Sequence, residues 1–392
     1  MKSTLLLTTL AFIVLSISSC NLDNPLGPGD PKNIEPILLE DRYDNDITLT
    51  DHNGDGVDYI VADIIEIYGG KMTIEPGVTI EFEDGSGLLV GIEGRLDAVG
   101  TSGEPIRMIA KENEPSWSGI YINTTKANKI HHVIIENAGK GESFGVFNEF
   151  DAAVTVDGSL SMENSTITKS GEMGLIVNRT DESSIEDFSG NTIKDSENFP
   201  IYTNINFLED LNLAENSFSN NGTNMIAITD RYADRLTRDI ELDGLDIPYF
   251  LSGEFEIYGN LTLNRGVDFV MDNNTLLDHD AGDDYRFEIK GTESDHVVIR
   301  GAESENGYWQ GIYITSQNSG NQFEYLDISD GGGKELTFRD GKANIAIDLG
   351  GTLTVRDCTS ARSGDCEVFL SNFSGTNTFI NESPAITKVC EE

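Results

Sequence analysis

Short runs of alternating apolar and polar residues recur along the chain from about residue 51 onward, separated every few residues by Gly, Asn, Asp or Ser. Examples are Met72-Thr73-Ile74, Val78-Thr79-Ile80-Glu81-Phe82, Val154-Thr155-Val156 and Leu261-Thr262-Leu263. Alternation of this kind predicts short β-strands joined by tight turns. Only residues 230–242 place apolar residues four apart, as on one face of a helix. The pattern therefore predicts an all-β chain.

Similar turn-and-strand units recur at intervals of about 25 residues. Asn164, Asn191 and Asn216 each precede a short apolar run, with separations of 27 and 25 residues. Such a period is typical of solenoids, whose coils stack on one another. The leucine-dense consensus of leucine-rich repeats is missing, and propeller blades need about 40 residues each. We expect coils of two or three strands, with the asparagines stacked as a ladder that satisfies backbone groups of neighbouring coils.

A longer repeat is superimposed on this period. Three segments return in the same order, at offsets of 190, 192 and 193 residues. They are Glu66-Ile67-Tyr68-Gly69 with Glu256-Ile257-Tyr258-Gly259, Trp117-Ser118-Gly119-Ile120-Tyr121 with Trp309-Gln310-Gly311-Ile312-Tyr313, and Gly158-Ser159-Leu160-Ser161-Met162 with Gly351-Thr352-Leu353-Thr354-Val355. Because both the spacing and the order persist, the chain contains an internal duplication.

Four segments of the first copy carry a resemblance to a known group of proteins. They are Thr73-Ile74-Glu75-Pro76-Gly77-Val78, Gly94-Arg95-Leu96-Asp97-Ala98-Val99-Gly100-Thr101, Pro105-Ile106 and Trp117-Ser118-Gly119-Ile120. From about Asp51 onward the chain resembles bacterial surface lipoproteins with a right-handed parallel β-helix, part of the broad pectate-lyase-like group. The resemblance implies an all-β fold, a right-handed parallel β-helix solenoid built from the internal duplication. It implies little about activity, because one fold hosts many functions.

The N-terminus has the pattern of an export signal. Lys2 precedes an apolar run, residues 5–17, that is too short to span a bilayer permanently. Leu15-Ser16-Ile17-Ser18-Ser19-Cys20 resembles the lipobox of bacterial lipoproteins, which implies that Cys20 is lipidated and becomes the first mature residue. Asn21 after the cysteine favours the outer membrane. The alternative is an ordinary cleaved signal with an incidental Cys20. We expect a lipid-anchored protein, on the cell surface rather than in solution.

These features predict a division of the chain into five segments. Residues 1–19 are the signal peptide, and residues 20–37 are the lipidated cysteine followed by a tether rich in Pro and Gly. Residues 38–228 form the first β-helix copy with an N-terminal cap, and residues 248–392 form the second. Residues 229–247 break the strand rhythm and form an excursion or a joint.

The chain is strongly acidic, with 68 Asp and Glu, 26 Lys and Arg and a formal net charge of −42. Removal of residues 1–19 takes away one lysine, so the mature charge becomes −43. A surface of this sign repels nucleic acid and argues against an anionic polysaccharide unless divalent cations bridge the two. A solubilising surface is the simpler explanation of the charge.

Three cysteines follow Cys20, namely Cys358, Cys366 and Cys390. An exported protein is in a compartment where disulfides form. Cys358 and Cys366 flank a turn that contains Gly, so they are the favoured pair, with Cys366–Cys390 as the alternative. One cysteine is left free in either case.

One segment resembles the first half of a calcium loop. Asp51-His52-Asn53-Gly54-Asp55-Gly56-Val57-Asp58 carries oxygen side chains at alternating positions and Gly at the sixth. The candidate ligands for Ca²⁺ are Asp51, Asn53, Asp55 and Asp58. The twelfth position is Ala62, where an EF-hand has a bidentate glutamate. The alternative is a turn rich in Asx and Gly that leads into the first strand.

The repeated pentapeptide supplies the candidate ligand-binding residues. If Ile120 and Ile312 point inward, strand alternation turns Trp117, Tyr121, Trp309 and Tyr313 outward. Paired flat rings of this kind suit sugar rings or the side chains of a protein partner. In the alternative interpretation a loop covers these rings, or the tryptophans lie inside.

Motifs of polygalacturonase-like catalytic sites are missing, as are nucleophile, phosphate-loop and redox motifs. The sequence therefore predicts a non-catalytic cell-envelope lipoprotein that binds glycan or a protein partner. Two alternatives remain at this point. The first is a polysaccharide lyase or glycoside hydrolase whose site is assembled from distant coils, and the second is a purely structural envelope protein.

Overall fold

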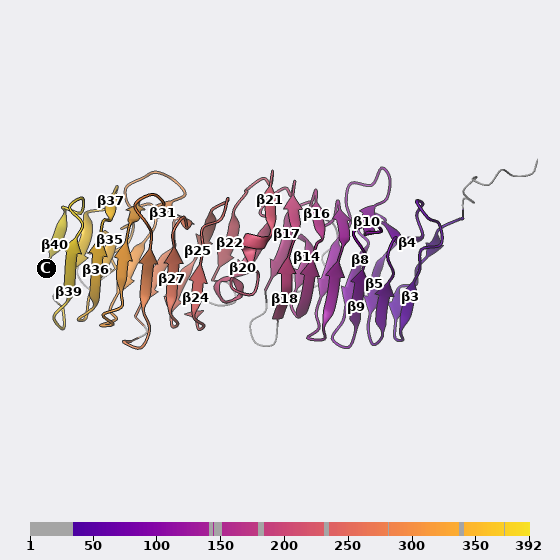
Figure 1. Ribbon diagram of the computed structural model, residues 1–392, viewed down its shortest axis with the longest axis horizontal. Helices are drawn as coiled ribbons and strands as arrows, with labels where there is room; N and C mark the ends of the chain where they lie inside the picture. The colour runs from indigo at the N-terminus through magenta and orange to yellow at the C-terminus, as the bar shows by residue number, and fades with distance from the viewer. Residues whose placement is uncertain are drawn as a thin grey trace, which may run out of the picture. The chain divides into compact units, whose positions relative to one another are not determined.

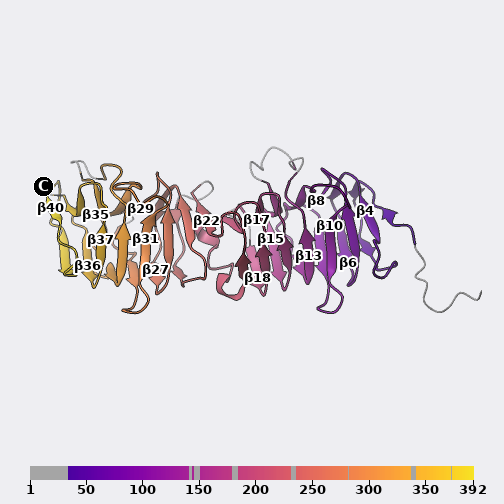
Figure 2. The ribbon, with the colours of Figure 1, turned by 90° about the horizontal axis from the view of Figure 1, so that it is seen from above.

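The computed structural model describes residues 34–140, 144, 151–178, 184–230, 235–280, 282–336, 341–371 and 373–392. They belong to one compact unit, Ile34–Glu392, which has its own hydrophobic core and so meets the criterion of a domain that folds independently. In Figures 1 and 2 its strands follow one another in chain order, from the indigo strands near β3 to the yellow strand β40.

The first part of the unit contains three parallel sheets. The eight-stranded sheet contains β1 (Ile37–Leu38), β4 (Tyr59–Val61), β7 (Thr79–Phe82), β10 (Ile106–Ala110), β13 (Val133–Glu136), β16 (Thr166–Thr168), β19 (Thr192–Lys194) and β21 (Ser217–Ser219). The first six-stranded sheet contains β3 (Ile47–Leu49), β6 (Lys71–Ile74), β9 (Arg95–Val99), β12 (Asn128–His131), β15 (Ser159–Glu163) and β18 (Ser184–Ser189).

The third sheet has thirteen strands and runs through both sequence copies. It contains β2 (Arg42–Tyr43), β5 (Ile64–Ile67), β8 (Gly87–Val90), β11 (Gly119–Ile122), β14 (Ala152–Val156), β17 (Met173–Val177), β20 (Ile201–Asn204), β22 (Ile226–Thr229), β25 (Tyr249–Ser252), β28 (Asp268–Met271), β31 (Val297–Gly301), β34 (Leu326–Ser329) and β37 (Thr359–Ala361).

Two further sheets complete the second part. The seven-stranded sheet contains β23 (Arg235–Leu236), β26 (Glu254–Ile257), β29 (Leu276–His279), β32 (Gly311–Ile314), β35 (Ala343–Ile347), β38 (Cys366–Leu370) and β40 (Val389–Glu391). The second six-stranded sheet contains β24 (Ile240–Leu242), β27 (Leu261–Asn264), β30 (Phe287–Lys290), β33 (Gln322–Glu324), β36 (Thr352–Arg356) and β39 (Thr378–Glu382).

Each coil crosses three sheets in turn and then pairs in parallel with the next coil, as β5 does with β8 and β26 with β29. Inward side chains stack on inward side chains because the ladders keep the strands in register. In the thirteen-stranded sheet one inward row is Ile65, Leu88, Ile120, Val154, Leu175, Ile201 and Ile226, all buried. The prediction of an all-β parallel β-helix solenoid is confirmed.

An amide ladder fills the turn that leads into the eight-stranded sheet, although its first member differs from the prediction. The Asn191 side chain accepts from the Ser165 amide (3.0 Å) and donates to the Met162 carbonyl (2.8 Å), and Asn216 Oδ1 accepts from the Asn191 amide (2.9 Å). Asn164 was predicted to belong to this ladder, but it is exposed in a left-handed conformation (φ 50°). The buried Ser165 takes its place, because the left-handed bend shifts the inward position by one residue.

Two sheets of the first part, the first six-stranded sheet and the eight-stranded sheet, end before residues 229–247. The short 3₁₀ helices η1 (Ile205–Phe207) and η2 (Leu213–Glu215) come after β18, the last strand of the first six-stranded sheet. The eight-stranded sheet ends at β21, whereas the thirteen-stranded sheet continues from β22 to β25. The helical pattern noted at residues 230–242 is wrong for the described part, which forms β23 and β24. Tertiary pairing with β26 and β27 overrides that weak local pattern.

The two sequence copies do not use the same sheets. Glu66-Ile67 lies on β5 and Tyr121 on β11, both in the thirteen-stranded sheet. Their counterparts Glu256-Ile257 and Tyr313 lie on β26 and β32, both in the seven-stranded sheet. The second copy is therefore displaced by one sheet around the coil.

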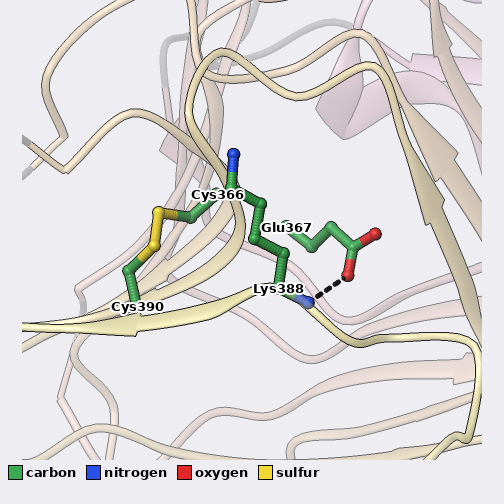
Figure 3. The surroundings of a disulfide bond; sticks show 4 residues. All are labelled: Cys366, Glu367, Lys388 and Cys390. Carbon is green, nitrogen blue, oxygen red and sulfur yellow. Dashed lines mark hydrogen bonds between the residues drawn. A yellow bond between two sulfur atoms is a disulfide. The ribbon is translucent and has the colours of Figure 1, made fainter.

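At the first coil, β1, β2 and β3 belong to the ladders themselves, so the segment expected to form the N-terminal cap includes strands of the solenoid. At the other end Cys366 and Cys390 form a disulfide that joins β38 to the last strand (Figure 3). The favoured pairing of Cys358 with Cys366 is wrong, and the alternative is correct. Cys358 is a buried free thiol in the interior core, whereas Cys366 and Cys390 belong to a separate cluster on the outer side of the seven-stranded sheet.

Candidate functional site

The tryptophans of the repeated pentapeptide lie in the core. Trp117 and Trp309 have no exposed surface, and their indole N–H groups donate to the Glu136 carbonyl (3.0 Å) and the Ser329 carbonyl (2.7 Å). The prediction that they face outward is wrong, and the alternative that they lie inside is correct. The reason is the glycine that follows at Gly119 and Gly311, where φ values of 102° and 123° interrupt the alternation of the strand.

The two tyrosines of the pentapeptide do point outward, but Tyr121 is buried and Tyr313 is partly buried. Tyr121 is only 6% exposed and donates to Asp157 (2.5 Å), while Tyr313 donates to Asp348 (3.4 Å). The Phe144 ring lies 5.8 Å from the ring of Tyr121. Leu336, 192 residues later in the chain, packs in the same cluster as Tyr313. Both copies therefore place an apolar side chain near the tyrosine, although Tyr313 stays partly exposed.

The candidate calcium ligands do not converge on a common point. Both carboxylate oxygens of the buried Asp58 already accept backbone amides, from Asn53 and His52 (2.8 and 2.9 Å) and from Thr79 (2.9 Å). The Asn53 amide group donates to the Val57 carbonyl (2.9 Å), and Asp51 accepts from the Gly54 amide (2.8 Å), whereas Asp55 is exposed. Across the described ranges, no three His, Cys, Asp or Glu side chains form a metal-binding group. The segment is the Asx-rich turn of the alternative interpretation.

On the outward side each copy has a row of four residues, three of which are the same residue type in both copies; we call this row the repeat face. In the first copy the row is Arg42, Glu66, Leu89 and Tyr121, and in the second it is Arg235, Glu256, Asp278 and Tyr313. In each copy the four side chains come from four consecutive coils and are held in register by the ladder.

The exposed end of each repeat face has the same construction. In the first copy the Arg42 guanidinium donates to Glu66 (2.9 Å) and lies 3.6 Å from the ring centre of Tyr68. In the second, Arg235 donates to Glu256 (2.5 Å) and its guanidinium lies 4.9 Å from the ring centre of Tyr258. We call these groups the two Arg–Glu–Tyr sites.

Each Arg–Glu–Tyr site combines a flat apolar ring with a donor and an acceptor that remain in contact with water. Tyr68 is 48% exposed, and the Glu66 and Glu256 side chains are each 32% exposed. A tyrosine ring can pack against the apolar face of a ligand ring. The guanidinium and carboxylate beside it can form hydrogen bonds with the polar substituents of that ligand. Part of the signal was present in the sequence, in the repeated Glu-Ile-Tyr-Gly. The arginines were missed because they come from the preceding coil, 24 residues before Glu66 and 21 before Glu256.

The second copy adds a carboxyl group where the first has Leu89. Burial, together with the negative charges of Asp280, Glu256 and Glu254, raises the pKa of Asp278 to about 7. Its Oδ1 atom is buried without a hydrogen-bond partner. A pKa of about 7 leaves this carboxyl group partly protonated at neutral pH, where an ordinary surface aspartate is almost fully ionised.

A hollow of about 510 Å³ lies along the turns after β10, β13 and β16. Its lysines are already engaged by carboxylates, Lys140 with Glu197 (3.3 Å) and Lys169 with Glu136 (2.7 Å). Its described lining carries Asp84, Asp195 and Glu197 against these two lysines, so it reserves no cation for an anionic ligand.

The predicted lipidation residue, Cys20, lies outside the described residues, as does the whole of the signal peptide. Within the described ranges no helix has the length and apolar content needed to cross a bilayer. No protein-family model, no curated protein and no solved structure matches the chain.

Proposed function

We propose that this protein is a non-catalytic binding module of the bacterial cell envelope, anchored by a lipid on Cys20 and exposed at the outer membrane. The resemblance of four segments of the first copy to pectate-lyase-like β-helix lipoproteins favours this assignment. The single observation that carries it is the presence of the same outward Arg–Glu–Tyr site in both copies. Similar inward residues are required to build the coils, but similar outward groups on a solvated surface are not.

The ligand that we propose is a neutral polysaccharide. At the first site the half-exposed Tyr68 ring offers an apolar platform for the C–H face of a sugar, and the neighbouring Arg42 and Glu66 offer a donor and an acceptor for its hydroxyl groups. A net charge of −42 disfavours acidic polymers in the absence of a bridging cation. A protein partner would use the same groups, and the experiment below distinguishes it.

The test uses residues 34–392 and four soluble neutral polysaccharides, namely dextran, a linear mannan, a β-1,3-glucan and starch. Retention on an affinity gel that contains one of them, and at least a tenfold loss of affinity in the Tyr68→Ala, Tyr258→Ala double variant, would support the proposal. The double variant Tyr68→Phe, Tyr258→Phe is the matched control, because it keeps the rings. Equal retention of the wild type and the alanine variant would refute the site, and no retention by any polymer would refute the ligand class.

The anchor is tested separately in cells. Metabolic labelling with a fatty-acid analogue should mark the wild-type chain and not the Cys20→Ser variant. Protease added to intact cells should degrade the labelled protein if it is exposed at the surface. Labelling of the variant would contradict lipidation at Cys20.

A second candidate function is hydrolysis or lysis of a polysaccharide, which Asp278 favours. A carboxyl group with a pKa of about 7 beside ionised carboxylates has the electrostatics of a general acid. Release of reducing ends or unsaturated products, abolished by Asp278→Asn, would support this function over simple binding. If neither binding nor turnover occurs, a purely structural envelope protein is left.

A further inference from the structure

We infer that the two Arg–Glu–Tyr sites bind two separate polysaccharide chains at the same time, so that the protein cross-bridges its ligand. This inference rests on the proposed function and adds the geometry of binding to it. Three observations carry it, namely the shared Arg, Glu and Tyr of the two sites, their placement on different sheets and the hydrogen bonds that hold the junction between the copies.

The two sites share the same three residue types, although Tyr68 is 48% exposed and Tyr258 is only partly exposed. Each has an arginine that is paired with a glutamate of the next coil and faces a tyrosine ring. The arginine side chains are 46% and 54% exposed, and both glutamates are 32% exposed. A ligand that binds one site therefore meets the same three groups at the other, with Asp44 as an additional partner of Arg42 (3.1 Å) at the first site.

The sites face in different directions. The first lies on β5 in the thirteen-stranded sheet, and the second on β26 in the seven-stranded sheet, which borders the thirteen-stranded sheet in every coil of the second copy. Seven strand-to-strand steps separate β5 from β25, the strand that directly precedes β26. At roughly 4.8 Å a step, the sites are displaced by about 34 Å along the stack.

The junction keeps this relation fixed. The thirteen-stranded sheet is continuous through β20, β22 and β25. On the neighbouring side, Arg238 forms two hydrogen bonds with Asp210 (2.8 and 3.0 Å). Asn206 accepts from the Thr237 amide (3.0 Å), so the segment around η1 is tied to the start of the second copy. With no hinge among these described contacts, the two sites cannot rotate onto one face.

This geometry decides how a polymer is bound. One chain that lies along one face reaches one site, because the other site is on the neighbouring face. Because one polymer chain cannot occupy both sites, occupation of the first site does not raise the effective concentration of ligand at the second. The polymer therefore gains no affinity from the presence of two sites. Two different chains are captured instead, one by each face.

The experiment measures stoichiometry and cross-linking with residues 34–392 and the polysaccharide that the gel identifies. A hexasaccharide of that polymer should titrate two equivalent sites by calorimetry, and Tyr68→Ala or Tyr258→Ala alone should leave one, a twofold reduction. The long polymer should scatter light strongly with the wild type and not with either single variant. Its affinity per site should stay within about threefold of that for the hexasaccharide.

Two results would overturn the inference while leaving the proposed function intact. A single hexasaccharide site in the wild type would show that the copies are not equivalent. Two sites without scattering, and with polymer bound at least tenfold more tightly than hexasaccharide, would show that one chain occupies both. Failure of all four polymers to bind is a different result, because it overturns the proposed function and removes the inference with it. The Tyr→Phe variants should behave as the wild type throughout.

Discussion

Replacement of Asp278 by asparagine should stabilise the protein, and the gain should grow with pH. Asparagine keeps the size of the side chain but cannot ionise. In the folded protein the pKa of Asp278 is about 7, against about 3.8 for an exposed aspartate. Ionisation of Asp278 in the folded state is therefore disfavoured by burial and by its acidic neighbours, so the wild type carries a cost that the variant lacks.

The sign and the size follow from proton linkage. A raised folded pKa means that the folded state binds more protons than the unfolded state between pH 4 and pH 7. The free energy of unfolding therefore falls as pH rises through this window and is constant above it. A shift of about three units corresponds to about 4 kcal/mol at most. Because Asp278 keeps partial contact with solvent, we expect about half of that, about 2 kcal/mol.

The assay is urea-induced unfolding of wild type and variant at pH 4 and at pH 8, followed by circular dichroism. Asp278→Asn should be close to wild type at pH 4 and about 2 kcal/mol more stable at pH 8. Asp55→Asn is the matched control, because it removes the same charge from an exposed turn. An equal effect of Asp278→Asn at both pH values would refute the reasoning, because it would show that ionisation of Asp278 has no cost in the folded state.

Two further predictions concern the core and the C-terminal end. Trp117→Ala should lower the free energy of unfolding in urea by about 3–5 kcal/mol, because it leaves a cavity beside Phe82 and removes an indole hydrogen bond. If the free energy of unfolding does not change, the ring lies outside the core. Cys390→Ser removes the disulfide, which joins residues 24 apart and contributes about 3.5 kcal/mol to stability. Hydrogen exchange of backbone amides should become faster in β38 and β40 but not in β5. An equal increase in all three strands would contradict a local role of the disulfide.

The period of about 25 residues and the alternation of apolar residues were sufficient to predict the solenoid, because the parallel ladder requires similar inward residues in every coil. The same logic failed where the backbone leaves the strand conformation. The positive φ of Gly119 interrupts the alternation, so Trp117 points inward. Asn164 has a left-handed backbone conformation, so Ser165 rather than Asn164 points inward. Neither backbone conformation is determined by the local alternation of apolar and polar residues.

The candidate site was less predictable than the fold. Tyr68 and Glu66 were visible as half of a repeated tetrapeptide, but Arg42 joins them only through the pairing of β2 with β5. The pairing of Cys366 with Cys390 depended on which side of a sheet each sulfur faces, and this requires the register of the last coil. The displacement of the second copy required a count of strands through the segment with η1 and η2, where the period of the sequence is interrupted.

The offset between the copies also bears on how such a chain evolves. Each coil of this solenoid has three strands, so a duplicated segment can begin on any one of three sheets. Parallel pairing remains possible in each case, because the ladder is formed by backbone groups, which are the same in every strand. A duplication that begins one strand out of phase preserves the core and turns every outward side chain of the new copy to the neighbouring side. Insertion or loss of a single strand can therefore redirect a whole surface in one genetic event, with no change in the residues that form it.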